Sequence, residues 1–131
     1  MLEDVAKERS RESLLLEQND HMCGAVYLAG YVVECRLKSL LNKMGKPFPA
    51  SGRSGHNLVG LWDAAGLRSK DIRGHRRAFL DLWDTSLRYR ANLPPSPCAA
   101  KELLIGARDL AAIVTRQIRT TRVRWRGSVR S

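Results

Sequence analysis

The sequence predicts an all-α fold, an antiparallel up-and-down bundle of four to five helices. Apolar residues recur at three- and four-residue steps, and polar turn signals divide the chain into segments of helical length. No segment shows the convincing alternation of a strand. With 131 residues, 44% of them hydrophobic, the chain is long enough to bury one core. We therefore expect one helical domain over residues 1–120, followed by a basic and flexible tail over residues 121–131.

The first two helices are predicted over residues 2–17 and 21–44. The first has apolar side chains near both ends and a charged middle, and Asp20 after it is expected to cap the second. The second is apolar over a wide surface, which is typical of a central helix packed by several neighbours. Its Gly30 costs up to about 1 kcal/mol relative to alanine. We expect a glycine here because it allows another helix to cross closely at this point.

Three further helices are predicted over residues 56–65, 70–89 and 98–120. The stretch 47–55, which is rich in Pro, Gly and Ser, is expected to be a loop. The three prolines within residues 93–97 end the fourth helix, because proline can neither continue a helix nor donate a backbone hydrogen bond. The last helix leads directly into the basic tail.

A polar stripe follows the otherwise apolar second helix. Tyr27, Tyr31, Glu34 and Lys38 stand at steps of 4, 3 and 4, which places them on one face. Glu34 and Lys38 can pair, and an exposed pair of this kind contributes only about 0.2–0.5 kcal/mol. In an apolar setting an unpaired carboxylate is costly, so the stripe needs polar partners from elsewhere in the fold.

Three pieces of the chain occur in a particular order: residues 25–38, then Gly55-His56-Asn57-Leu58, then Arg88-Tyr89. Together they resemble the HEPN domains (higher eukaryote and prokaryote nucleotide-binding), over roughly residues 1–120. The resemblance implies a helical bundle that commonly forms a homodimer. It also implies RNA or nucleotide as ligand, in toxin–antitoxin, phage-defence or RNA-processing systems, with a nucleotidyltransferase-type antitoxin as a partner.

The nuclease members of this family carry an Arg-x4-6-His motif late in the bundle, and this chain departs from that pattern. No histidine follows Arg88 at the required spacing. Arg68 and His75 satisfy the spacing, but earlier in the chain than the family would have it. We therefore favour an RNA- or nucleotide-binding module without the usual catalytic motif. The alternatives are an RNA-cleaving toxin that uses Arg68 and His75 or an atypical site around Arg88, and a helical adaptor that binds a partner protein.

The candidate ligand-binding site, or polar network, combines the stripe with the two downstream motifs. We expect Glu34 to receive His56 or Arg88 and so to organise a polar centre. The full set is Tyr27, Tyr31, Glu34, Lys38, His56, Arg88 and Tyr89.

Charge is concentrated at the C-terminus. The chain has a net charge of +10, and its last sixteen residues hold six arginines and no acidic residue. Such a tail attracts polyanions through counterion release and Arg–phosphate pairing, although a merely solvated tail has the same composition. Trp125 could stack on a base there. The candidate nucleic-acid tail comprises Arg116, Arg119, Arg122, Arg124, Trp125, Arg126 and Arg130.

Other partners find little support in the composition. The three cysteines form no Cys-x-x-Cys pair, so we expect no metal, no cofactor and no disulfide framework. No apolar run approaches the length of about 18 residues that a membrane span needs. The acidic, mixed N-terminus does not resemble a secretory signal. A cytoplasmic protein with no membrane partner fits these features best.

Overall fold

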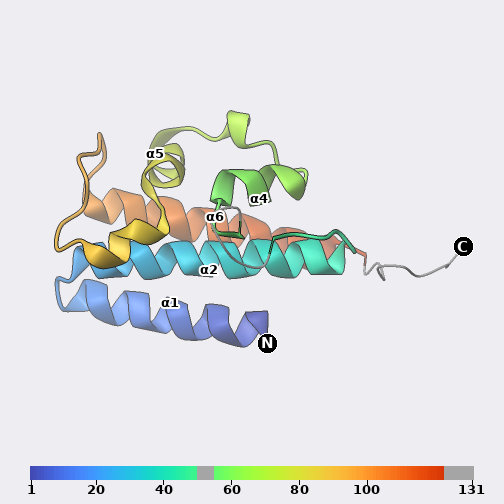
Figure 1. Cartoon of the computed structure of the whole chain (residues 1–131), viewed down its shortest axis with the longest axis horizontal. Helices are drawn as coiled ribbons and strands as arrows, with labels where there is room; N and C mark the ends of the chain where they lie inside the picture. The colour runs from blue at the N-terminus through green and yellow to red at the C-terminus, as the bar shows by residue number, and fades with distance from the viewer. Residues whose placement is uncertain (50–54, 123–131) are drawn as a thin grey trace, which may run out of the picture.

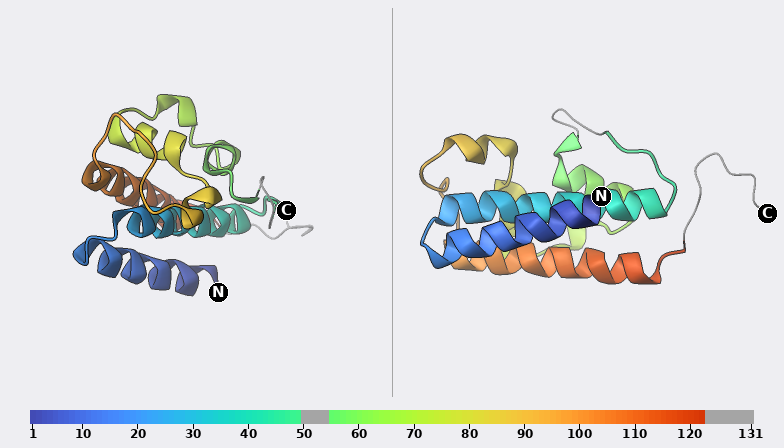
Figure 2. Two further views of the ribbon diagram at one scale, coloured as in Figure 1. Left: turned by 60° about the vertical axis from the view of Figure 1, so that its left-hand side comes forward. Right: turned by 90° about the horizontal axis from the view of Figure 1, so that it is seen from below.

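Helix α2 (Met22–Lys43) forms the centre of the molecule, and α1 (Leu2–Gln18) and α6 (Ala100–Thr120) both lie along it (Figure 1). The computed structural model describes residues 1–49 and 55–122. Helix α1 runs antiparallel to α2, whereas α6 runs in the same direction as α2 (Figure 2). Helix α2 is largely enclosed by its neighbours, as its wide apolar surface predicts.

Among the residues that the structure describes, four short elements carry the chain back from the end of α2 to the start of α6. They are α4 (Leu58–Ala64), η1 (Ser69–Asp71), α5 (Gly74–Leu82) and η2 (Thr85–Tyr89). They cover the side of α2 that faces away from α1 (Figure 1). The all-α bundle is confirmed. The segment from α4 to η2 takes the place of a third long helix in it.

The prediction of one continuous helix over residues 70–89 is wrong. Gly74 begins α5 with φ at +68°, and Arg73 before it is extended. The extended Trp83 ends α5, and Asp84 then starts η2 by accepting a hydrogen bond from Ser86 N at 2.7 Å. Glycine and aspartate make these breaks without any proline, so the apolar pattern alone does not reveal them.

Two expectations about helix starts also differ from the structure. Asp20 does not cap α2, because it adopts the left-handed turn conformation with φ at +62°, and His21 takes the N-cap position. The predicted helix 56–65 begins two residues later, at Leu58, because the Asn57 side chain caps it by accepting from Gly60 N at 3.1 Å.

Two glycines allow close packing in the core. A Cβ atom on Gly30 would lie 1.9 Å from Nε1 of Trp83, and one on Gly106 would lie 2.5 Å from the carbonyl oxygen of His75. The first contact corrects the expectation of a crossing helix, since the Trp83 side chain fills the space over Gly30. The second allows the backbone of α5 to approach α6. At both positions close packing leaves no room for a side chain, which explains the glycine.

The structure adds two negative findings for residues 1–49 and 55–122. Within these ranges no helix has the length and apolar character needed to cross a membrane. Nor does this part of the chain gather three or more His, Cys, Asp or Glu side chains that could hold a metal ion. The three cysteines are free.

Candidate functional site

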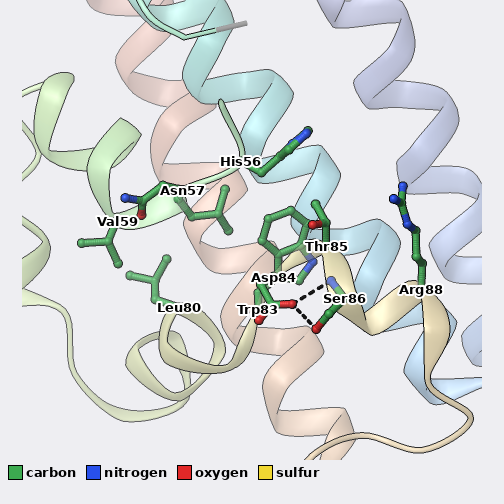
Figure 3. A pocket seen from close by; sticks show the side chains of 10 residues that line it. His56, Asn57, Val59, Leu80, Trp83, Asp84, Thr85, Ser86 and Arg88 are labelled. Carbon is green, nitrogen blue, oxygen red and sulfur yellow. Dashed lines mark hydrogen bonds between the residues drawn. The ribbon is translucent and has the colours of Figure 1, made fainter. Parts of the chain in front are cut away.

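A cleft of about 820 Å³ lies between the start of α4 and η2. Figure 3 shows that its side chains come from the residues around the start of α4, from the end of α5 and from η2. His56 and Arg88 are the basic side chains that line it, and Asp84 is the acidic one. The lining residues are His56, Asn57, Leu58, Val59, Leu80, Trp83, Asp84, Thr85, Ser86 and Arg88.

The buried Glu34 carboxylate connects the polar stripe of α2 to this cleft. Glu34 is only 4% exposed. Its Oε2 lies 3.0 Å from Lys38 Nζ, and its Oε1 lies 2.7 Å from His56 Nδ1. Of the two expected partners, His56 is therefore the one that meets Glu34. The structure gives no hydrogen bond or ion pair between Glu34 and Arg88, both of which it describes.

The contact with Glu34 defines how His56 presents its ring. A carboxylate that is ion-paired to a lysine has no proton to donate, so Nδ1 of His56 carries the hydrogen and donates it to Glu34. The other ring nitrogen, Nε2, is then the atom available to a ligand. Since the His56 side chain is 29% exposed and lines the cleft, the imidazole is anchored on one side and accessible on the other.

Lys38 completes the network on the far side of Glu34. Its side chain is 7% exposed, and its Nζ lies 5.8 Å from the centroid of the Phe48 ring. The aromatic face favours a cation at this distance. Lys38 is thus a buried counter-charge for Glu34, and it does not line the cleft.

Tyr31 packs against the His56 ring, and Tyr27 and Trp83 pack against Tyr31. The Tyr31 ring lies 5.9 Å from the His56 ring and 5.6 Å from the Trp83 ring, edge-on in both cases. Trp83 Nε1 donates to the carbonyl oxygen of Tyr27 at 2.9 Å. Burial, the hydroxyl of Tyr27 at 3.2 Å and the charge of Glu34 all raise the pKa of Tyr31. Tyr31 therefore stays protonated and serves the packing of the site.

Arg88 and Tyr89 lie in η2, and both are exposed. The guanidinium carbon of Arg88 lies 4.8 Å from the centroid of the Tyr89 ring. Interactions with the side chains of Tyr89 and Tyr27 raise the pKa of Arg88, so this group is a permanent cation. A guanidinium on the cleft can bind an oxyanion such as a phosphate. Nε2 of His56 can donate a hydrogen bond to the same anion when both ring nitrogens carry a hydrogen.

Arg68 and His75, the other catalytic candidates, do not line this cleft. Arg68 has a positive φ of 59° before η1, and its exposed side chain pairs with Asp71 at 3.2 Å. His75 lies in the first turn of α5, where its carbonyl oxygen faces Gly106. The two residues that fit the Arg-x4-6-His spacing therefore do not belong to the cleft that His56 and Arg88 line.

The candidate nucleic-acid tail falls partly outside the described residues. Arg116 and Arg119 are exposed on α6, and Arg122 is exposed just beyond it. The remaining members, Arg124, Trp125, Arg126 and Arg130, lie outside the described ranges.

The sequence reasoning missed several polar residues of the cleft. Thr85 and Ser86 line it because Asp84 turns the chain there, accepting hydrogen bonds from both Ser86 N and Ser86 Oγ (Figure 3). The signal that could have revealed them is local: an aspartate followed by two hydroxyl residues is typical of a turn or a helix start.

Comparison of this chain with protein-family models, with curated proteins and with solved structures finds no match.

Proposed function

We propose that the protein is a HEPN-like RNA- or nucleotide-binding module, and that the cleft between α4 and η2 receives a phosphate group of the ligand. The observation that carries the proposal is the anchored His56 imidazole, which shares the cleft with the cationic Arg88. The net charge of +10 supports a polyanionic partner. The order of the sequence motifs supports the HEPN-like character.

Electrostatics indicate which part of the cleft suits the phosphate. Asp84 carries a negative charge and repels an anion, whereas Arg88 attracts it. Because His56 Nδ1 is engaged by Glu34, the ring can approach the ligand only through Nε2. We therefore assign the phosphate to the part of the cleft that His56 and Arg88 share.

The wider biological setting is part of the same proposal. The resemblance to HEPN domains favours a homodimer that works in a toxin–antitoxin or defence-type system, with a nucleotidyltransferase-type antitoxin as its partner. RNA cleavage is a less favoured activity, because Arg68 and His75 do not line the cleft.

The proposal is tested by the affinity of the full chain for a fluorescently labelled single-stranded RNA at low salt. Arg88→Gln is expected to lower the affinity about tenfold or more, since a hydrogen bond to a charged group contributes about 1.5–3 kcal/mol. Fluorescence anisotropy measures this change. His56→Gln is expected to weaken binding as well, because the variant loses the imidazole.

Arg11→Gln is the charge-matched control. Arg11 is exposed on α1, which lies on the opposite side of α2 from the cleft (Figure 1). Equal losses in both arginine variants would show that only net charge matters and would contradict the assigned site. If the wild-type chain binds neither RNA nor nucleotides, the adaptor alternative is favoured. RNA cleavage that His75→Ala abolishes would instead support the Arg68–His75 alternative.

A further inference from the structure

Tyr89 is an aromatic residue that the fold leaves open to solvent. It is 78% exposed, whereas Leu87 in the same short helix is 2% exposed. Among the residues that the structure describes, no other Phe, Trp or Tyr side chain is exposed. Because so little of its surface is buried, Tyr89 contributes little to the core, and its ring is accessible to a ligand.

The position of Tyr89 connects it to the cleft. Arg88 lines the cleft, and its guanidinium carbon lies 4.8 Å from the centroid of the Tyr89 ring. A flat apolar surface therefore adjoins a cation that suits a phosphate. A nucleotide carries its base and its phosphate on the same sugar, so it can contact both side chains.

Trp83, which lines the cleft itself, cannot offer a stacking surface. Trp83 is 6% exposed, its Nε1 is bonded to the carbonyl oxygen of Tyr27, and its ring covers Gly30. A base that entered the cleft would have to displace these contacts in order to stack on the Trp83 ring. Stacking at this site therefore depends on Tyr89.

We propose that Tyr89 stacks on an unpaired nucleobase of the ligand while Arg88 and His56 bind a phosphate of the same nucleotide. This inference rests on the proposed function of the cleft and specifies the ligand class as a nucleotide whose base is free of pairing. Such a nucleotide is either a mononucleotide or part of a single-stranded RNA. Since every base has a π face, the contact tolerates any base sequence.

The test compares the affinities of the full chain for probes that carry a base and for a probe that does not. The probes are AMP, ribose 5-phosphate, a single-stranded RNA 12-mer and the same RNA annealed to its complement. Tyr89→Leu is expected to lower the affinity for AMP and for the single strand about five- to 150-fold, as stacking on an aromatic side chain predicts. Tyr89→Phe, which keeps the aromatic face, is expected to rescue binding. Titration calorimetry measures the small probes, and anisotropy measures the RNAs.

Leu15→Ala is the matched control, because Leu15 is an apolar side chain on α1 that is 54% exposed. Equal losses for ribose 5-phosphate and AMP in Tyr89→Leu, unchanged affinities in that variant, or equal affinities of the wild type for single and double strands would each overturn the stacking inference. If the wild type binds no probe at all, the proposed function fails and the inference with it. Tight binding of the single strand with weak binding of AMP would support the inference and identify RNA as the source of the nucleotide.

Discussion

At the scale of single residues, the carboxylate of Glu34 has the largest consequences. It is almost fully buried on α2, where an isolated charge loses its hydration. Lys38 and His56 contact one oxygen each and compensate for that loss. The same carboxylate therefore supports the packing of α2 and fixes the ring that the cleft presents to a ligand.

Replacing Glu34 by leucine is expected to destabilise the protein by about 3–5 kcal/mol. The reason is that the buried ammonium of Lys38 loses the carboxylate that compensates its charge. Urea denaturation followed by circular dichroism measures the free energy of unfolding.

The double variant Glu34→Leu/Lys38→Met serves as the control. Because both charges are removed together, it is expected to recover much of the stability lost in Glu34→Leu. If Glu34→Leu changes the free energy of unfolding by less than 1 kcal/mol, the ion pair is not buried in the way described.

At the scale of elements, Trp83 helps to attach the junction after α5 to α2. The Trp83 ring covers Gly30, and its Nε1 donates to the carbonyl oxygen of Tyr27 one turn earlier on α2. Trp83 is also the residue at which α5 ends and the chain turns into η2. The packing at Gly30 therefore helps to place η2, and with it Arg88, beside the cleft.

Gly30→Ala is expected to lower the free energy of unfolding by about 1–3 kcal/mol. Helix propensity by itself predicts the opposite sign, a gain of up to about 1 kcal/mol. The clash between the new Cβ and Trp83 Nε1, at 1.9 Å, explains why packing should outweigh propensity. Thermal and urea unfolding both measure the change.

Gly24→Ala on the same helix provides the comparison. Its added Cβ would lie 3.1 Å from Cδ1 of Leu16, the end of a flexible side chain that can adjust. We expect this variant to be neutral or slightly stabilising. A stabilised Gly30→Ala protein would contradict the close contact between α2 and Trp83.

At the scale of the whole molecule, the proposed function assigns the attraction of a polyanion to the excess positive charge and the specificity of the contact to the cleft. The net charge of +10 acts over distances of about 10 Å at ordinary ionic strength. Arg116 and Arg119 extend this charge along α6. Affinity for RNA should therefore depend both on local contacts and on salt.

Replacing Arg124, Arg126 and Arg130 together by glutamine is expected to reduce the salt dependence of RNA binding. Each phosphate contacted on a single strand contributes about 0.7 to the slope of log affinity against log salt, so the slope should fall by up to about two units. Anisotropy titrations between 50 and 300 mM salt measure it.

The Arg88→Gln variant sets the scale for this experiment, because it removes one cationic contact within the cleft. An unchanged slope in the triple variant would show that these three arginines do not contact RNA. A lower affinity with an unchanged slope would contradict the electrostatic role in the same way.

Much of the fold could be predicted because its signals are local. The apolar periodicity of α1, α2 and α6 identifies these helices to within one or two residues. The pairing of Glu34 with Lys38 follows from their spacing of four residues. The breaks inside residues 70–89 escaped prediction because Gly74 and Asp84 interrupt a segment whose apolar residues still follow helical spacing.

The sequence by itself thus determined that the chain forms helices, and that α2 carries a polar stripe in need of partners. Only the tertiary structure decided which partner meets Glu34, where Arg88 lies and how far Tyr89 is exposed. The physical reason is the range of the interactions. Helical periodicity and i,i+4 pairing act between near neighbours in the chain. The contact of His56 with Glu34 joins residues 22 positions apart, and the contact of Trp83 with Tyr27 joins residues 56 positions apart, so both depend on how the elements pack.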